Sequence, residues 1–316
     1  MKKILVLGAG GQIGSELTLK LRSIYGNENV VASRNRTPLI DEIENSGPTV
    51  TIDATKKEQI EKVVKEYEID TIFNLAAILS AAAEADPMWG WNIGMSALLN
   101  CLEVAREYNC ALSTPSSIGA FGESSPLDNT PQDTVQRPKT MYGITKVAGE
   151  LLSDYYFHKY GVDTRSVRYP GIISNVTLPG GGTTDYAVEI YYAAVKGEKF
   201  ICPLPKDMSL DMMYMPDAID AAIELMEADP EKLVHRNSFN VTAMHFTPED
   251  IYASIKKYIP EFEMEYDIDP VKTQIAASWP NYMDDSCARE EWGFNPKYDL
   301  DAMTQDMIKV LREKLK

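Results

Sequence analysis

A tyrosine and a lysine one helical turn apart are the residues of this chain best suited to acid-base chemistry. Tyr142 and Lys146 lie in a segment, 142–160, that has the apolar pattern of a helix. Side chains four residues apart share one face of a helix, so the Lys146 cation can lie beside the Tyr142 phenol. A neighbouring positive charge favours the charged form of an acid. The pair therefore predicts a phenolate base that works near neutral pH.

A serine upstream of this pair is suited to assist the same base. Ser117 follows a short predicted strand, 111–113, within the segment Pro115-Ser116-Ser117. Its hydroxyl can share a substrate hydroxyl with Tyr142, orient that hydroxyl and stabilise charge on the reacting oxygen. A serine in a turn is usually structural, but the Tyr-x-x-x-Lys pattern downstream favours a functional role. We therefore predict a catalytic set of Ser117, Tyr142 and Lys146.

A glycine cluster between the first strand and the first helix predicts a phosphate-binding loop. The glycines Gly8, Gly11 and Gly14 follow the strand, and Gln12 and Ile13 separate the last two. Glycines let backbone amides approach a pyrophosphate, and the helix N-terminus adds partial positive charge. A plain tight turn is the alternative interpretation. The position directly after a strand favours a dinucleotide, so these five residues are predicted to contact cofactor phosphates.

The end of the second strand bears on the choice between NAD and NADP. An acidic residue about 20 residues beyond the glycine loop usually binds the ribose of NAD, but this segment reads Ala32-Ser33-Arg34-Asn35-Arg36. Because a guanidinium suits a phosphate, Arg34 by itself favours NADP, unless it is a solvated loop arginine. Asp53, after the third strand, lies where a carboxylate can reach the adenine amino group, although a surface aspartate is nearly as plausible.

Another predicted strand end supplies small residues and a hydroxyl near the nicotinamide. Leu75, Ala76 and Ala77 lie at the end of the predicted strand 72–75, and small side chains there let the chain pass close to the nicotinamide ribose. Ser80 comes shortly afterwards and places a hydroxyl at the expected cleft, because ligands bind at the carboxyl ends of such strands. A merely well-packed strand end is the alternative interpretation.

These residues depend on an alternating arrangement of strands and helices. Short β-branched runs alternate with helical patterns through the first half of the chain, which is the rhythm of βαβ units. We expect an α/β fold: a Rossmann doubly wound parallel sheet with a smaller carboxy-terminal α/β substrate domain. Residues 1–170 are predicted to form the dinucleotide-binding domain, and a later strand near 237–242 returns to it. Residues 171–316 are predicted to form mainly the substrate domain, partly interleaved with the first.

Composition narrows the class of protein. The chain has 316 residues and a net charge of -16, which disfavours nucleic acid because phosphates demand a concentrated basic surface. No apolar run approaches the roughly 20 residues of a membrane helix, and the apolar run at the N-terminus is too short for a secretory signal. We expect a cytoplasmic protein whose partners include neither nucleic acid nor a membrane.

The cysteines and histidines show no ligand spacing. The four cysteines lack any CxxC pattern and the three histidines are far apart in the chain, so we expect no metal site and reduced thiols. They are Cys101, Cys110, Cys202 and Cys287, and His158, His235 and His245.

Taken together, these motifs resemble the extended short-chain dehydrogenase/reductase family. The resemblance rests on the glycine pattern, on Asn74-Leu75-Ala76-Ala77, on the serine pair before Phe121-Gly122, and on Tyr142 with Lys146. Within that family the chain is similar to the NAD-dependent L-threonine 3-dehydrogenase subgroup. The segments that carry this narrower similarity are Gly11-Gln12-Ile13-Gly14, Pro115-Ser116-Ser117-Ile118, Tyr169-Pro170-Gly171, Gly180-Gly181-Gly182-Thr183-Thr184-Asp185-Tyr186-Ala187 and Ser278-Trp279-Pro280.

The resemblance implies an oxidoreductase of threonine catabolism. The β-hydroxyl of L-threonine would be oxidised to give 2-amino-3-ketobutyrate, with Tyr142 as base and Lys146 holding the nicotinamide ribose. Tyr142 itself and Tyr169 would add cofactor contacts. The amino-acid substrate would be bound by Ser117 and Tyr142 and by a second group of residues, Ser80, Gly182, Thr183, Thr184, Asp185 and Trp279, and the glycines at 180–182 would hinge a lid.

The same resemblance implies a cofactor and a partner. NAD is the first choice because the subgroup uses it, and NADP stays plausible because members of the subgroup usually have an acidic residue where Arg34 stands. A homodimer is expected, formed through the predicted helices 95–108 and 142–160.

Two other functions have to be weighed. A nucleotide-sugar epimerase or dehydratase uses the same tyrosine and lysine, but commonly carries an arginine for the pyrophosphate where this chain has Leu210. The asparagine that those enzymes place after the Arg-Tyr strand is also missing, because Arg168-Tyr169-Pro170-Gly171 stands there. A non-catalytic dinucleotide sensor typically loses the catalytic tyrosine, which this chain keeps.

Overall fold

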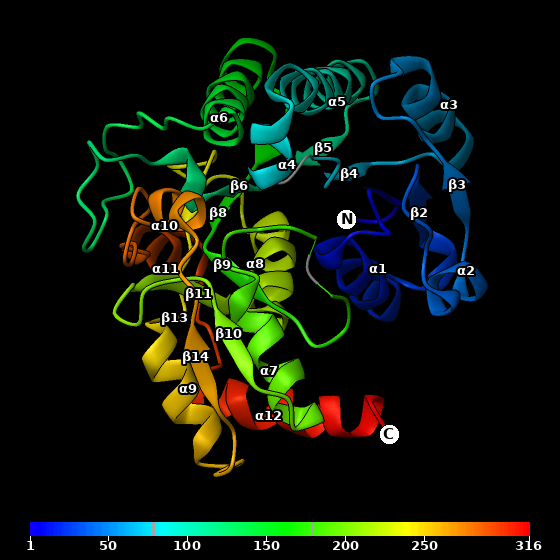
Figure 1. Cartoon of the computed structure of the whole chain (residues 1–316). Coiled ribbons are helices and arrows are strands. Elements are labelled where there is room, and N and C mark those ends of the chain that lie inside the picture. The colour runs from blue at the N-terminus through cyan, green and yellow to red at the C-terminus, as the bar shows by residue number, and fades with distance from the viewer. Residues whose placement is uncertain (78–79, 179) are drawn as a thin grey trace.

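A six-stranded parallel sheet forms the centre of the first half of the chain. The computed structural model describes residues 1–77, 80–178 and 180–316 (Figure 1). The strand order is β3-β2-β1-β4-β5-β7, and its pairings are parallel. The strands are β1 (Ile4–Leu7), β2 (Val30–Arg34), β3 (Thr49–Thr51), β4 (Thr71–Asn74), β5 (Ala111–Ser113) and β7 (Thr164–Arg165). The predicted Rossmann-like doubly wound sheet is confirmed.

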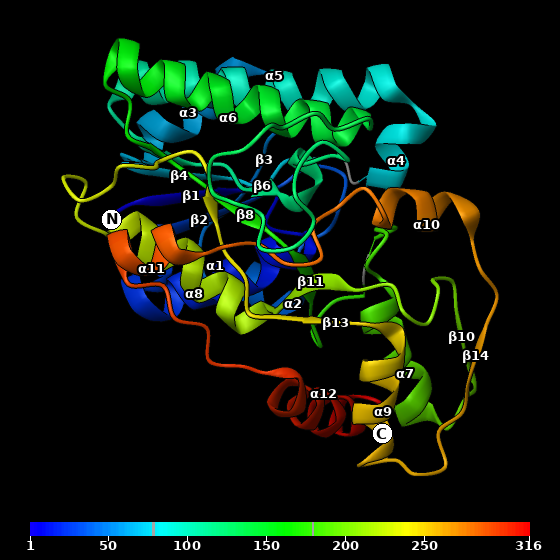
Figure 2. The ribbon, with the colours of Figure 1, turned by 90° about the vertical axis from the view of Figure 1, so that its left-hand side faces the viewer.

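Helices cover both faces of this sheet. Ile4 and Val6 of β1 pack with α1 and α8, whereas Leu5 and Leu7 pack with α3, α5 and α6, because successive side chains of a strand point to opposite faces. Figure 2 shows the two layers of helices on opposite sides of the strands. The helices on the side of this sheet are α1 (Gln12–Tyr25), α2 (Asp41–Ser46), α3 (Lys57–Tyr67), α4 (Ser80–Ala85), α5 (Pro87–Tyr108) and α6 (Met141–Tyr160), with short 3-10 turns η1 (Asn27–Asn29) and η2 (Ile118–Ala120), and α8 (Met215–Glu227) joins them from later in the chain.

The helix α5 begins earlier than the sequence pattern indicated. It starts at Pro87 instead of residue 95, because Pro87 suits the first helical position and the Asp86 carboxylate accepts a hydrogen bond of 3.1 Å from the Trp89 amide. The helix spans 22 residues and packs along α6, which spans 20. Among the described residues, no helix combines the length and the apolar character that crossing a membrane requires.

A second parallel sheet lies beside the first and joins distant parts of the chain. Its order is β12-β8-β6, with Phe239 paired to Val167 and Ser117 paired to Tyr169. The strands are β6 (Ser116–Ser117), β8 (Val167–Tyr169) and β12 (Phe239–Asn240). The segment near 237–242 therefore lies next to β8. On the other side of β8, the strand β6 places Ser117 beside Tyr169.

The rest of the chain forms a smaller α/β lobe with its own core (Figure 1). Its core contains the fully buried Tyr186, Tyr191 and Tyr214. Its strands form the sheets β13-β11-β9 and β10-β14. The elements are β9 (Gly171–Ile173), α7 (Tyr186–Lys196), β10 (Phe200–Cys202), β11 (Leu210–Tyr214), β13 (Met244–Phe246), α9 (Pro248–Lys256), β14 (Met264–Tyr266), α10 (Pro270–Ala276) and α12 (Leu300–Lys314). The helix α11 (Ser286–Trp292) packs instead in the core that contains α1 and α8.

A half-buried carboxyl group links α1 to the segment that follows β9. The Ser174 hydroxyl donates a 2.5 Å hydrogen bond to Glu16. Burial raises the pKa of Glu16 to about 7, although the bond from Ser174 and the charge of Lys314 oppose that rise. The folded protein therefore binds a proton on Glu16 between about pH 4.5 and 7 that the unfolded chain has released.

This contact predicts that stability decreases as the pH rises from about 4.5 to 7. The contribution of protonated Glu16 is present at low pH and lost above its folded pKa, on the order of 2 kcal/mol. Glu16→Gln keeps an acceptor for Ser174 and carries no charge, so it should be more stable than the parent at pH 8 and nearly equal to it at pH 5. Urea denaturation at the two pH values measures this, with the exposed Glu66→Gln as control. Equal differences at both pH values would exclude Glu16 as the source.

Candidate active site

A single cavity at the carboxyl ends of the parallel strands collects almost every residue predicted for the site. It has a volume of about 530 Å³, which suits a small-molecule ligand. Except for Arg34 and Asp53, all of the residues predicted to bind cofactor or substrate line it. They are Gly8, Gly11, Gln12, Ile13, Gly14, Leu75, Ala76, Ala77, Ser80, Ser117, Tyr142, Lys146, Tyr169, Gly182, Thr183, Thr184, Asp185 and Trp279.

The start of α6 positions the predicted base. The Thr140 side chain accepts a 3.1 Å hydrogen bond from the Gly143 amide, so the helix begins there and Tyr142 lies in its first turn. One turn further on, the Lys146 Nζ lies 5.3 Å from the centre of the Tyr142 ring. It also donates a 2.8 Å hydrogen bond to the Pro115 carbonyl. The cation is thus held beside the tyrosine by the segment that carries the serine pair.

Gly119 separates Tyr142 from Ser117 and lets both approach the same point. The Ser117 Oγ accepts a 3.1 Å hydrogen bond from the Gly119 amide. A Cβ atom at Gly119 would lie 3.0 Å from the Tyr142 ring and 3.5 Å from the Ser117 Oγ. Any side chain at this position would therefore press on the ring. The structure brings the Tyr142 ring and the Ser117 hydroxyl together at Gly119, and it holds the Lys146 cation over the same ring.

A buried ion pair supports the strand that carries Ser117. Glu150, two turns beyond Tyr142 on α6, accepts hydrogen bonds from Arg168 at 3.0 and 2.8 Å and another from the Ser116 hydroxyl. Gln136 donates a 2.8 Å bond to the same carboxylate, and the remaining Arg168 nitrogen donates to Asn240 at 3.0 Å. The carboxylate and guanidinium thus have polar partners. Sequence reasoning missed Glu150 because its partner comes from a distant strand.

The glycine loop forms a close contact that only glycine permits. A Cβ atom at Gly14 would lie 2.2 Å from the Gly8 carbonyl oxygen, so no other residue fits without moving backbone. This contact brings the N-terminus of α1 against the end of β1. The N-cap residue Gly11 has no side chain to satisfy the first amides of the helix, and such amides bind phosphate groups.

Three buried polar groups of the cavity have no protein partner among the described residues. Gln12 Nε2, Thr114 Oγ1 and Thr177 Oγ1 are buried without a hydrogen bond, and all three residues line the cavity. Buried polar groups are nearly always hydrogen-bonded, so a polar ligand in the cavity would satisfy them. Together with the glycine loop, these groups fit a dinucleotide. Sequence reasoning missed Thr114, Thr177 and Thr37, another lining residue, because isolated threonines carry no motif.

The structure does not place Arg34 or Asp53 at this cavity. The Arg34 guanidinium forms an ion pair with Glu44 of α2, which directs it to a neighbouring helix. The Asp53 carboxylate accepts bonds from the hydroxyl and amide of Thr55 at 2.7 and 3.0 Å, and these bonds lower its pKa. Both side chains therefore bond to nearby protein groups outside the cavity. At the end of β2, the residue that lines the cavity is Thr37.

A short turn before α7 lines the same cavity. The Asp185 carboxylate accepts hydrogen bonds from the amides of Gly181 and Gly182, at 2.8 and 2.6 Å. Burial raises the pKa of Asp185, and these two bonds act against the rise. The turn holds Thr183, which is only 3% exposed, against the cavity. Trp279, 7% exposed, covers the same region.

Leu210 does not take part in the site. It lies fully buried in the core of the smaller lobe and does not line the cavity. The next residue, Asp211, is also fully buried, and burial raises its pKa well above the ordinary value. Its carboxylate accepts bonds from the Thr242 hydroxyl and the Met283 amide, which makes it a structural group.

Comparison with known proteins shows one family along most of the chain. The NAD-dependent epimerase/dehydratase family matches residues 4–242. An uncharacterized epimerase/dehydratase of Staphylococcus haemolyticus is 55% identical over 314 residues, which cover 99% of each chain.

Solved structures similar to this chain carry a narrower description. The L-threonine dehydrogenase of Clostridium difficile superposes with a TM-score of 0.96 at 56% identity, covering 99% of this chain and 98% of that one. The L-threonine dehydrogenase of Cupriavidus necator superposes with a TM-score of 0.94 at 47% identity, covering 99% of this chain and all of the other. The likeness extends through both lobes and therefore includes the whole cavity.

Proposed function

The chain belongs to the NAD-dependent epimerase/dehydratase family, and we propose that it oxidises L-threonine to 2-amino-3-ketobutyrate. The observation that carries the proposal is the convergence of Ser117, Tyr142 and Lys146 in the cavity that also contains the glycine loop. The similarity to two solved L-threonine dehydrogenases supports this substrate.

The side chains of the cavity perform the proton transfer. The phenolate oxygen of Tyr142 takes the proton of the substrate β-hydroxyl, and the Ser117 hydroxyl donates a hydrogen bond to the same oxygen as it becomes a carbonyl. Lys146 stabilises the negative charge of the phenolate from one side of the ring and is close enough to the cavity to hold a ribose hydroxyl. A bound nicotinamide supplies the acceptor for the hydride that leaves the β-carbon.

The turn before α7 and Ser80 of α4 hold the amino-acid head group in this proposal. A zwitterion needs several fixed polar contacts in an enclosed site, and Ser80, Thr183 and Thr184 offer hydroxyls there. Asp185 fixes the turn that carries the two threonines, through its bonds to the glycine amides. Trp279 excludes water from the same region. Movement about the glycines of this turn admits the substrate.

We propose NAD as the cofactor because Arg34 is engaged elsewhere. A 2′-phosphate would have to compete with Glu44 for the guanidinium, and the Glu44 carboxylate would repel it. Glu44→Gln should therefore raise kcat/KM for NADP by roughly threefold, the effect of an exposed charge pair. Arg34→Gln should leave kcat/KM for NAD within about twofold of the parent value. Initial rates with each cofactor measure both, and a large loss with NAD in Arg34→Gln would place the arginine at the ribose.

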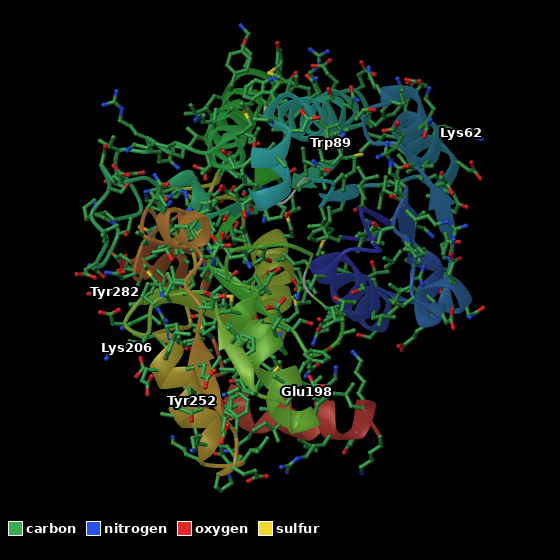
Figure 3. All side chains as sticks on the ribbon, viewed as in Figure 1. Lys62, Trp89, Glu198, Lys206, Tyr252 and Tyr282 are labelled. Atoms are coloured by element: carbon green, nitrogen blue, oxygen red, sulfur yellow. The ribbon has the colours of Figure 1, made fainter. Side chains whose placement is uncertain are left out.

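We propose a homodimer through exposed apolar side chains of α5 and α6. Leu99 of α5 is 38% exposed, and Leu151 and Tyr155 of α6 are 63% and 51% exposed. Figure 3 labels Trp89, another exposed aromatic residue at the beginning of α5. A surface with this many apolar groups is expected to pack against a partner.

A charge on this surface should dissociate the dimer. Leu151→Glu would bury an unpaired carboxylate between the subunits, which is strongly unfavourable. Sedimentation velocity should show a dimer for the parent and a monomer for Leu151→Glu. Val271→Glu is the matched control, because Val271 is 64% exposed on α10, away from α5 and α6. A monomeric parent, or a variant that stays dimeric, would exclude this interface.

A panel of substrates tests the proposed reaction against the alternative within the family. The family description and the relative from Staphylococcus haemolyticus favour a nucleotide-sugar epimerase or dehydratase as the second candidate. The purified protein with NAD should reduce the nicotinamide when given L-threonine and should leave UDP-glucose unchanged. Conversion of the nucleotide sugar without threonine oxidation would favour the second candidate. Tight NAD binding without turnover of either would favour a dinucleotide sensor.

A further inference from the structure

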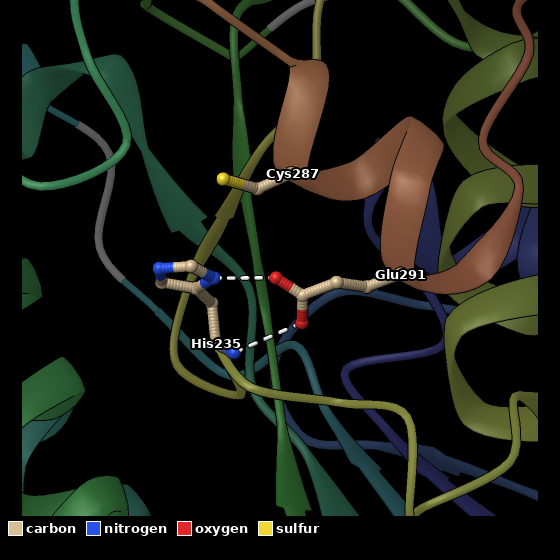
Figure 4. Close-up of side chains that lie close together, drawn as sticks. All are labelled: His235, Cys287 and Glu291. Atoms are coloured by element: carbon tan, nitrogen blue, oxygen red, sulfur yellow. Dashed lines mark hydrogen bonds and ion pairs between the residues drawn. The ribbon is translucent and has the colours of Figure 1, made fainter.

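A histidine, a cysteine and a glutamate lie together outside the active-site cavity (Figure 4). The ligand atoms of His235, Cys287 and Glu291 lie within 4.8 Å of one another, and none of these residues lines the cavity. Cys287 and Glu291 are one turn apart on α11, and His235 comes from the segment that leads into β12. The His235 Nδ1 is 2.5 Å from one Glu291 oxygen.

Both the carboxylate and the imidazole are held by neighbours. The second oxygen of Glu291 accepts hydrogen bonds from the amides of Val234 and His235, at 2.6 and 3.0 Å. This leaves the first oxygen directed toward the histidine. On the other side of the ring, the His235 Nε2 lies 3.4 Å from the Asp133 carboxylate. A carboxylate on the second nitrogen and backbone amides on the second oxygen are the outer contacts that orient metal ligands.

The chemistry of the three donors selects the kind of ion. Thiolate and imidazole suit zinc and neighbouring transition metals, whereas magnesium and calcium prefer oxygen ligands alone. Three protein ligands leave one tetrahedral position for water. The side chains of His235 and Glu291 are 26% and 12% exposed, so an ion can enter from solution. We propose that His235, Cys287 and Glu291 bind a divalent transition metal of the zinc class.

The charges around the cluster favour a cation. Burial raises the pKa of the Cys287 thiol, and the carboxylates of Glu291, Asp284, Glu290 and Asp133 add to the effect. The same negative potential attracts a divalent ion. When the metal binds, the Cys287 thiol releases its proton to solvent, and bonds from the metal to sulfur, nitrogen and oxygen replace the contact between His235 and Glu291.

The site would fasten α11 to a segment that supports the active site. Beyond His235, the Ser238 carbonyl accepts a 2.6 Å bond from Gln132, whose own carbonyl binds Arg168 at 2.8 Å. A metal that binds only the folded arrangement raises its stability by mass action. The role is therefore structural, and it does not depend on which substrate the cavity takes.

Cobalt titration of the full chain tests the proposal. Metal-stripped protein should bind one Co²⁺ per chain with a Kd below about 10 μM, and should show a thiolate-to-cobalt charge-transfer band with tetrahedral visible bands. Zn²⁺ should displace the cobalt and raise the melting temperature, and Mg²⁺ should do neither. Failure of the parent protein to bind Co²⁺ in this range would overturn the proposal and leave the cluster as a hydrogen-bonded pair beside a free thiol.

Variants locate the site. Cys287→Ser should remove the charge-transfer band, although the other three cysteines remain, and Glu291→Gln should weaken Co²⁺ binding at least about 10-fold. His235→Asn should do the same, whereas His158→Asn and His245→Asn, at exposed positions, should leave binding unchanged. Circular dichroism shows which variants fold, and only the folded variants are used to assign the metal ligands. A charge-transfer band that persists in Cys287→Ser would place the metal elsewhere.

Discussion

Tyr142→Phe should lower kcat for L-threonine oxidation by roughly 100- to 10,000-fold, the range that general base catalysis contributes. The substitution removes the one oxygen that takes the substrate proton and leaves the ring against Gly119 in place. The cofactor loop at Gly8 to Gly14 is untouched, so the Kd for NAD should stay within about threefold of the parent value. Stopped-flow reduction of NAD gives the first quantity, and fluorescence titration gives the second.

A matched tyrosine provides the control for this prediction. Tyr155 lies further along the same helix and is half exposed, outside the cavity. Tyr155→Phe should keep the parent rate. If Tyr142→Phe kept it as well, another group would have to act as the base, and the assignment of the site would fail. If Tyr142→Phe lost NAD binding along with activity, the main role of the tyrosine would be to bind the cofactor and not to take the substrate proton.

Arg168→Met should lower the free energy of unfolding by about 3–5 kcal/mol, because it leaves the buried Glu150 carboxylate without its partner. Both side chains are at most 6% exposed, and the bonds between them measure 3.0 and 2.8 Å. Urea denaturation followed by circular dichroism measures the loss. The double variant Arg168→Met, Glu150→Leu removes both charges and should recover much of the stability.

A surface ion pair is the control for this second prediction. Lys199 pairs with Glu265 at an exposed position, so Lys199→Met should leave the urea midpoint unchanged within error, since such pairs contribute little. A small loss in Arg168→Met would mean that Glu150 is solvated or protonated once alone. A small loss would also mean that the ion pair does not hold Ser116 and its neighbour Ser117 in place.

Local motifs explain why much of the fold and the site could be predicted from the sequence. The glycine loop, the Tyr-x-x-x-Lys pair and the strand ends all depend on residues close together in the chain, and the structure brings them to one cavity. Arg34 shows where this reasoning stops. Its residue type favoured a phosphate, but Glu44 on the following helix engages it, and only the three-dimensional arrangement reveals that pairing.

Groups that depend on distant partners could not be found in the same way. Thr114 and Thr177 show their role only because burial leaves their hydroxyls without a partner in the described protein. Glu150 and Arg168 come from a helix and a strand whose contact no spacing predicts. For the same reason, the expectation of no metal site rested on separations in the sequence, whereas folding places His235 beside Cys287 and Glu291.

L-threonine that carries deuterium on its β-carbon tests the proposed reaction most directly. The purified enzyme should transfer one deuterium to the nicotinamide in each turnover, and mass spectrometry of the reduced cofactor should find the label there. Tyr142→Phe should form labelled cofactor only at its greatly reduced rate. Reduced cofactor without deuterium would mean that the hydride leaves another carbon. No reduction at all with L-threonine would contradict the assignment of this substrate.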